Sequence, residues 1–200
     1  MTNNSFIISN GTKPIALVFA ASVFAYVFVC ETLGHVLLLI TLLLMYIYRN
    51  PERDIKRNDS EILSICDGTV NTIDVFENHT DIYINVSILD THILRAPMDG
   101  DIKIVSKRFG LNLNPNSFLA TKLNESLRLR FENLDIEFLS GFFNSKIHID
   151  SQHNLIKGDK FGSFLNGIIK LRFEHNENIK LNVKIGDKLQ AGKTIIAFNK

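Results

Sequence analysis

The sequence has few cysteines and no excess of either charge, and each absence excludes a class of protein. Cys30 and Cys66 are the only two cysteines among 200 residues, without metal-ligand spacing or the framework of a disulfide-rich secreted protein. We therefore expect no metal site, and reduced thiols facing a cytosol. Lysine and arginine (22) nearly equal aspartate and glutamate (21). A nucleic-acid partner is not expected, because such proteins usually need a basic face.

Charge is almost missing from residues 14–48, where Glu31 is the only charged side chain. The apolar stretches on either side of residues 31–35 would form helices of roughly 24 and 20 Å, short of a ~30 Å hydrocarbon core. One interpretation is a helical hairpin with a polar tip. The other is a single tilted span that buries Glu31 and His35. An ionised glutamate at mid-depth is costly unless protonated or paired, which favours the hairpin.

Basic residues follow the apolar region and predict its orientation. They are Arg49, Arg53, Lys56 and Arg57. Bases beside a span mark the cytoplasmic side, so we expect the rest of the chain at the cytoplasmic face of the cell (inner) membrane. A signal peptide is disfavoured, because Lys13 is the only early base and the apolar stretch runs well past residues 20–22. The predicted organisation is a tail at 1–13, a membrane-embedded helical hairpin at 14–48, a basic linker at 49–61 and a β domain at 62–200.

The remainder alternates between apolar and polar residues with the period of a β-strand. Clear runs cover residues 81–86, 127–131, 169–173 and 179–183, as expected for antiparallel strands with one wet face. Residues 183–195 resemble the closing hairpins of biotinyl and lipoyl carrier domains. We predict a mainly β fold, an antiparallel sandwich and barrel hybrid with biotinyl/lipoyl-like hairpins. A membrane-tethered carrier domain modified at Lys188 is a minor alternative.

Six short segments, taken in order, resemble the short bacterial form of phosphatidylserine decarboxylase, and the resemblance covers the whole chain. Each is weak alone, but six in order are specific. The segments are Tyr48-Arg49-Asn50-Pro51-Glu52-Arg53, Ser64-Ile65-Cys66-Asp67-Gly68-Thr69-Val70, Asp90-Thr91-His92-Ile93-Leu94-Arg95-Ala96-Pro97, Asn124-Glu125, Ser140-Gly141-Phe142-Phe143 and Ala191-Gly192-Lys193-Thr194-Ile195-Ile196-Ala197.

The resemblance implies a proenzyme that cuts itself at a Gly-Ser bond and leaves a covalent pyruvoyl group. That carbonyl forms a Schiff base with the amine of phosphatidylserine and acts as an electron sink as carbon dioxide leaves. By motif match, Asp67 and His92 are the pair that activates the serine, and Arg95 either contacts the lipid phosphate or braces a turn. Implied partners are the phospholipid membrane, phosphatidylserine, and a homo-oligomer or a heterodimer of cleaved chains. Without the resemblance, Asp67 reads as a turn residue and His92 as a core or surface histidine.

Two positions compete for the processing serine. Counting from Gly158-Asp159-Lys160-Phe161-Gly162, which matches the family, places it at Ile168, after Gly167. Isoleucine has no hydroxyl. The triplet Phe161-Gly162-Ser163 has the letters of the cleavage motif, but needs an insertion after it. Two hypotheses follow: a membrane-bound phosphatidylserine decarboxylase cut between Gly162 and Ser163, or an inactive relative acting as a membrane-anchored lipid-binding or partner subunit.

Overall fold

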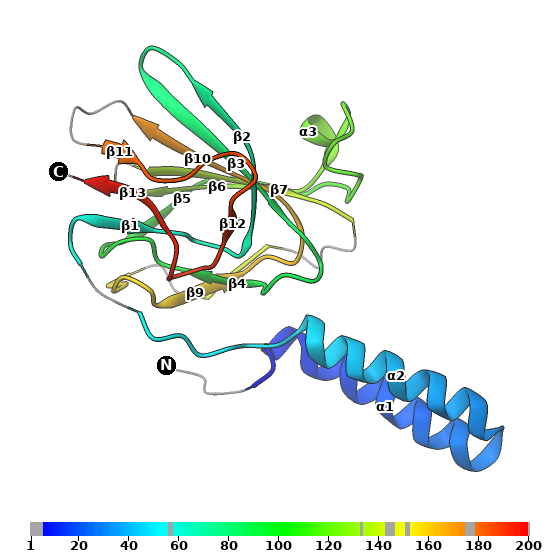
Figure 1. Cartoon of the computed structure of the whole chain (residues 1–200). Coiled ribbons are helices and arrows are strands. Elements are labelled where there is room, and N and C mark those ends of the chain that lie inside the picture. Colours follow the sequence, from blue (N-terminus) through cyan, green and yellow to red (C-terminus); the bar gives the residue numbers. More distant parts are fainter. Residues whose placement is uncertain are drawn as a thin grey trace. The chain divides into compact units, whose positions relative to one another are not determined.

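The computed structural model describes residues 6–55, 58–132, 134–142, 147–150, 153–174 and 179–199. The chain divides into two compact units, 1–52 and 53–200, and Figure 1 shows both. Lys56 and Arg57 of the predicted linker, and Phe143 of the fifth family segment, lie outside the described residues.

The first unit consists of two helices, α1 (Ser9–Phe28) and α2 (Glu31–Ile47). They run antiparallel, since the residue before α1 meets the residue after α2: the amide of Ile8 donates to the carbonyl of Tyr48 at 3.0 Å. Gly11 permits this close approach, since a Cβ there would lie 2.4 Å from the Tyr48 ring. The chain reverses at Val29 and Cys30, so the polar residues predicted as the tip form the first turn of α2.

Length and composition let α1 cross a membrane, whereas α2 is apolar but shorter. Many of their apolar side chains are exposed, with Leu17 and Phe28 each at 72%. At the end of α2, the Arg49 guanidinium lies 4.2 Å from the centre of the Tyr46 ring. A guanidinium over an aromatic face is a favourable cation–π arrangement.

The second unit is mainly β, as predicted, and its strands pair antiparallel in three sheets (Figure 1). The seven-stranded sheet has the order β12 (Lys188–Leu189), β2 (Gly68–Val75), β3 (His79–Val86), β10 (Gly167–Glu174), β7 (Leu134–Ser140), β6 (Ser126–Phe131) and β5 (Ile102–Arg108). One small sheet has the order β1 (Glu61–Leu63), β13 (Ile195–Asn199) and β11 (Ile179–Leu181). The other has the order β4 (Ile93–Arg95), β9 (Lys160–Ser163) and β8 (His148–Ile149). The biotinyl/lipoyl-like hairpins stay a prediction.

Period-two alternation gives the large sheet one apolar and one polar face. On the apolar face, a buried row crosses five strands: Leu127, Phe138, Ile169, Ile84 and Val70. On the other, a charged row crosses six strands: Lys103, Arg130, Asp135, Arg172, Asp81 and Asp74. The four strands predicted from alternation correspond to β3, β6, β10 and β11.

Between β5 and β6 the chain forms a long loop that ends in α3 (Ala120–Leu123). Asn124 is fully buried and fastens the loop to the sheet. Its side-chain amide donates to the carbonyls of Leu113 at 2.8 Å and of Ser140 at 2.7 Å, and its side-chain oxygen accepts from the amide of Leu113. In Figure 1, α3 stands out from one end of the large sheet.

Candidate functional site

Asp67 lies in the bend before β2, where three distant segments meet. Both its carboxylate oxygens accept from the Arg53 guanidinium, at 2.6 and 2.7 Å. The backbone amide of Ala191 donates to the same carboxylate at 2.8 Å. Burial alone raises the pKa of Asp67, but the hydrogen bonds from Arg53 and Ala191 outweigh it and bring the pKa below its ordinary value. The carboxylate is therefore ionised and fixed in place.

His92 precedes β4 and is 2% exposed. Its neighbour Thr91 belongs to the same cluster as the aspartate, because Nη2 of Arg53 donates both to the Asp67 carboxylate, at 2.7 Å, and to the Thr91 hydroxyl, at 3.5 Å. The strand that follows is held against the Asp67 segment, since the amide of Arg95 donates to the carbonyl of Ile65 at 2.8 Å. The structure thus brings the Asp67 and His92 backbones into one neighbourhood, and their roles stay a prediction.

Ser163 ends β9 and lies across the ladder from the residue after His92. The amide of Phe164 donates to the His92 carbonyl at 2.9 Å, and Ser163 pairs with Ile93. Paired residues of an antiparallel ladder project to one face, and neighbours along a strand project to opposite faces. The Ser163 side chain therefore shares a face with Ile93, whereas His92 precedes the strand and lies outside this alternation. The backbones of His92 and Ser163 therefore meet at the end of the β4–β9 ladder.

The bond between Gly162 and Ser163 lies inside a sheet. Gly162 pairs with Leu94 of β4 and Ile149 of β8, so β9 is hydrogen-bonded on both edges. A Cβ on Gly162 would come within 2.4 Å of the His148 carbonyl oxygen, so only glycine fits there without movement.

The competing position, Ile168, lies just inside β10. Gly167 before it has φ +137°, a conformation that favours glycine, and a Cβ there would lie 2.2 Å from the Leu139 carbonyl oxygen. Two buried acceptor atoms lie near this turn and make no hydrogen bond within the described part of the chain. They are Oε1 of Glu125, whose carbonyl accepts from Ser140, and Oδ1 of Asn166, whose carbonyl accepts from Gly141.

Arg95 is buried, and its guanidinium donates to the Gly158 carbonyl at 2.9 Å. This contact corresponds to the bracing role. Contact with a lipid phosphate stays a prediction. Cys66, beside Asp67, is buried as well, and burial together with the charges of Asp67 and Asp90 raises the pKa of its thiol. Among the described residues, no group of three or more His, Cys, Asp or Glu could hold a metal ion.

Arg53 is the site residue that sequence reasoning treated only as one of the basic linker residues that mark the cytoplasmic side. The structure uses it to hold Asp67, with both side chains largely buried. The sequence did contain a signal for this role, because Arg53 is the last residue of the first family segment. A base that only marks the cytoplasmic side could lie anywhere in the linker.

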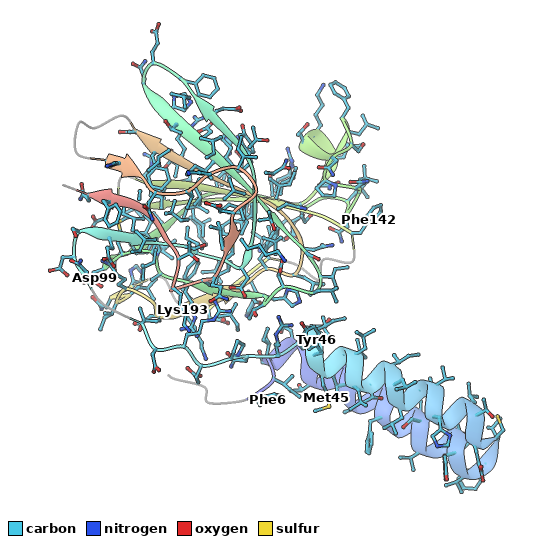
Figure 2. The ribbon with its side chains drawn as sticks, in the orientation of Figure 1. Phe6, Met45, Tyr46, Asp99, Phe142 and Lys193 are labelled. Carbon is cyan, nitrogen blue, oxygen red and sulfur yellow. The ribbon has the colours of Figure 1, made fainter. Side chains whose placement is uncertain are left out.

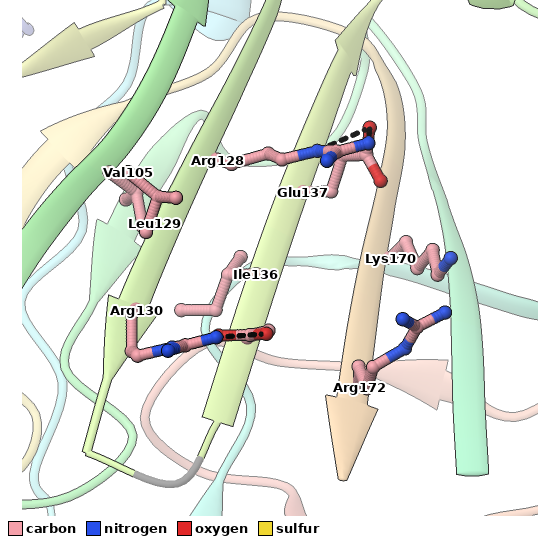
Figure 3. A pocket seen from close by; sticks show the side chains of 9 residues that line it. Val105, Arg128, Leu129, Arg130, Ile136, Glu137, Lys170 and Arg172 are labelled. Carbon is pink, nitrogen blue, oxygen red and sulfur yellow. Dashed lines mark hydrogen bonds and ion pairs between the residues drawn. The ribbon is translucent and has the colours of Figure 1, made fainter. Parts of the chain in front are cut away.

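A second charged region lies on the polar face of the large sheet, and a shallow hollow opens there (Figure 3). Arg128 pairs with Glu137 at 3.1 Å and Arg130 with Asp135 at 2.6 Å. The hollow is also lined by Val105, Leu129, Ile136, Lys170 and Arg172. None of the predicted site residues lines it.

Within this face, Asp81 is 1% exposed and accepts two hydrogen bonds from Arg172, at 2.7 and 2.8 Å. The Lys170 ammonium lies 3.0 Å from Oδ2 of the same carboxylate. Burial alone raises the pKa of Asp81, but the hydrogen bonds from Arg172 and Lys170 lower it overall. Nearly every charge described here has a partner of opposite sign on an adjacent strand.

Known proteins match the chain over almost its whole length. A family model described as phosphatidylserine decarboxylase matches residues 40–197. Three relatives are each named phosphatidylserine decarboxylase proenzyme. That of Anaplasma phagocytophilum is 32% identical over 92% of this chain and 86% of its own. That of Carboxydothermus hydrogenoformans is 27% identical, with coverage of 82% and 83%. That of Pelagibacter ubique is 26% identical, with coverage of 94% for both. No solved structure matches.

Proposed function

This chain belongs to the phosphatidylserine decarboxylase family, and on that premise we propose that it is a membrane-bound carboxy-lyase that converts phosphatidylserine to phosphatidylethanolamine in phospholipid biosynthesis. The observation that carries the proposal is the extent of the match, 92% of the chain at 32% identity to a protein named a decarboxylase proenzyme. The meeting of Asp67, Thr91 and His92 supports it, because residues 67 and 92 are the positions that correspond to the family's activating pair.

In this proposal α1 and α2 form a hairpin that enters and leaves the cell (inner) membrane on its cytoplasmic side. The antiparallel packing of the helices and their exposed apolar side chains support this. Tyr46 and Arg49 would then lie at the headgroups, where aromatic and basic residues are enriched. The division at residues 13, 48 and 61 remains part of the proposal.

The proposed role of Asp67 is to position His92. Its lowered pKa keeps the carboxylate charged at neutral pH. Its contacts with Arg53 and Ala191, together with the hydrogen bond from Arg53 to Thr91, hold the segment that carries the histidine. A fixed, ionised partner is how buried acids orient a histidine base in hydrolytic triads.

The pyruvoyl cofactor of the family derives from a serine, and neither candidate position offers a serine outside a hydrogen-bonded strand. Ile168 has no hydroxyl, and Ser163 is held in β9 between β4 and β8. Cleavage between Gly162 and Ser163 would require β9 to leave β4 and β8 first. This observation favours a second candidate function, an uncleaved relative that binds lipid or supports a partner subunit.

Denaturing electrophoresis with intact mass of the full chain, purified from its membrane, separates the candidates. If Ser163 is processed, the wild type yields fragments 1–162 and 163–200, the second blocked at its new terminus, and Ser163→Ala leaves one chain. Ser106→Ala, an exposed serine in β5, is the matched control and should cleave as the wild type does. A wild-type chain that stays whole would refute self-processing and leave the non-catalytic relative.

A further inference from the structure

The loop between β5 and β6 holds apolar side chains in solvent. Phe118 is 80% exposed and Phe109 is 73% exposed. Large apolar groups exposed together mark an interaction surface more often than chance exposure does. The other exposed apolar residues of the loop are Leu111, Leu119 and Leu123. Phe142, also exposed, projects from the same end of the unit in Figure 2.

This loop is built by specific hydrogen bonds. Its two arms are joined where the amide of Leu111 donates to the carbonyl of Leu123 at 2.7 Å. Arg108 spans the arms by donating to the carbonyls of Thr121, at 2.7 Å, and Asn124, at 3.0 Å. The exposed rings are therefore presented by an ordered backbone.

Only positive charge accompanies these rings. The Lys107 ammonium lies 5.1 Å from the centre of the Phe109 ring, and the Lys122 ammonium lies 5.4 Å from the centre of the Phe118 ring. Residues 107–123 contain three basic residues and no Asp or Glu. The sheet face described above carries charges of both signs, several of them paired, whereas this loop carries charge of one sign.

We propose that residues 107–123, the docking loop, insert shallowly into a bilayer that contains anionic lipids. Aromatic rings and lysines together suit the headgroup boundary, and anionic lipids attract the lysines. A protein partner fits less well, because lysine is depleted from protein–protein interfaces. The inference rests on the membrane localisation proposed above and is independent of decarboxylation.

The docking loop lies at the end of the large sheet that also carries the candidate site. The loop runs directly into Asn124 and Glu125, and Asn124 holds the carbonyl of Ser140, which pairs with Gly167. Phe164, bonded to the His92 carbonyl, lies 2.8 Å from where a Gly167 Cβ would be. The loop therefore docks the bilayer at the end of the sheet that carries the candidate site.

The chain has no tryptophan, so a single introduced indole reports its own position. The test uses full-length Phe118→Trp in vesicles of phosphatidylcholine, with and without phosphatidylglycerol, prepared with ordinary or brominated acyl chains. We expect bromine to quench the Phe118→Trp emission about twofold, as for a side chain buried at the headgroup and acyl boundary. Phe76→Trp, at an exposed position stacked on His79, is the matched control and should not be quenched.

Adding Lys107→Glu and Lys122→Glu to the Phe118→Trp variant should abolish the quenching on anionic vesicles. The helical anchor keeps every variant on the vesicles, so co-flotation reports the anchor and quenching reports the loop. Equal quenching of the two tryptophan variants would overturn the proposal. Absence of quenching with a concentration-dependent blue shift in detergent would also overturn it, and would assign the surface to a second copy of the chain.

Discussion

Asp67 and Asp81 are both buried carboxylates gripped by the two nitrogens of an arginine, yet they do different things. The partners of Asp81 are Arg172 and Lys170 on the neighbouring strand β10. These ion pairs join two strands that backbone hydrogen bonds already hold together. Asp67 takes Arg53 from 14 residues before it and Ala191 from 124 residues after it. The ion pairs of Asp81 therefore add to an existing sheet, whereas that of Asp67 joins separate segments of the chain at the candidate site.

Removing the arginine from each pair should give the largest difference. Arg53→Met leaves a buried carboxylate without its main partner, which we expect to reduce the free energy of unfolding by about 3–5 kcal/mol. Arg172→Met should cost about 1 kcal/mol or less, because this arginine is 39% exposed and Lys170 still faces Asp81. Urea unfolding of the detergent-solubilised chains, followed by circular dichroism, measures both. Equal losses would show that the Arg53 contact has no special role.

Acid should reveal what the two carboxylates have in common. The folded-state pKa of each carboxyl is lowered, so the unfolded chain binds more protons and stability falls as pH falls. The contribution is present above the unfolded pKa, roughly pH 4, and is lost as pH drops through the lower folded pKa. Asp67→Asn and Asp81→Asn should each flatten the curve of unfolding free energy against pH in this range. An unchanged slope in Asp67→Asn would mean that its carboxyl titrates alike in the folded and unfolded chains.

The smallest effect is expected from the exposed pair in the same charged row as Asp81. Arg130→Ala removes a contact in which both partners are more than a third exposed. Solvent and salt screen such pairs, so the urea midpoint should not move beyond experimental error. A clear drop would indicate that the row acts as one network, and the contrast between the two aspartates would then be weaker.

The sequence predicts the β unit well because alternation is a local signal. All four predicted strands form, and β10 extends beyond its prediction at both ends. Asp67 and His92 were recognisable through short motifs. The pairing of Asp67 with Arg53 and Ala191 was not, because it depends on where the two ends of the unit return in space. The turn between the helices was misplaced by a few residues, because polar residues such as Glu31 begin α2 as readily as they form a loop.

The face of Ser163 was also beyond sequence reasoning. A triplet of letters does not reveal the pleat, and a shift of one residue along a strand reverses every side chain. The structure resolves this through the pairing of Ser163 with Ile93. The exposed docking loop had no local signal either, since its apolar residues read equally well as core.

Strand β10 lies between β3 and β7 in the middle of the large sheet. Its position determines whether the two fragments of a cleaved chain would stay associated. A break at residue 162 or 167 would leave this central strand, with β11, β12 and β13, on the shorter piece. Its ladders to β3 and β7 would remain, so the two pieces would migrate together under native conditions and part only in denaturant. Size-exclusion chromatography would therefore not detect cleavage of this fold, because the two fragments would stay associated around the cut.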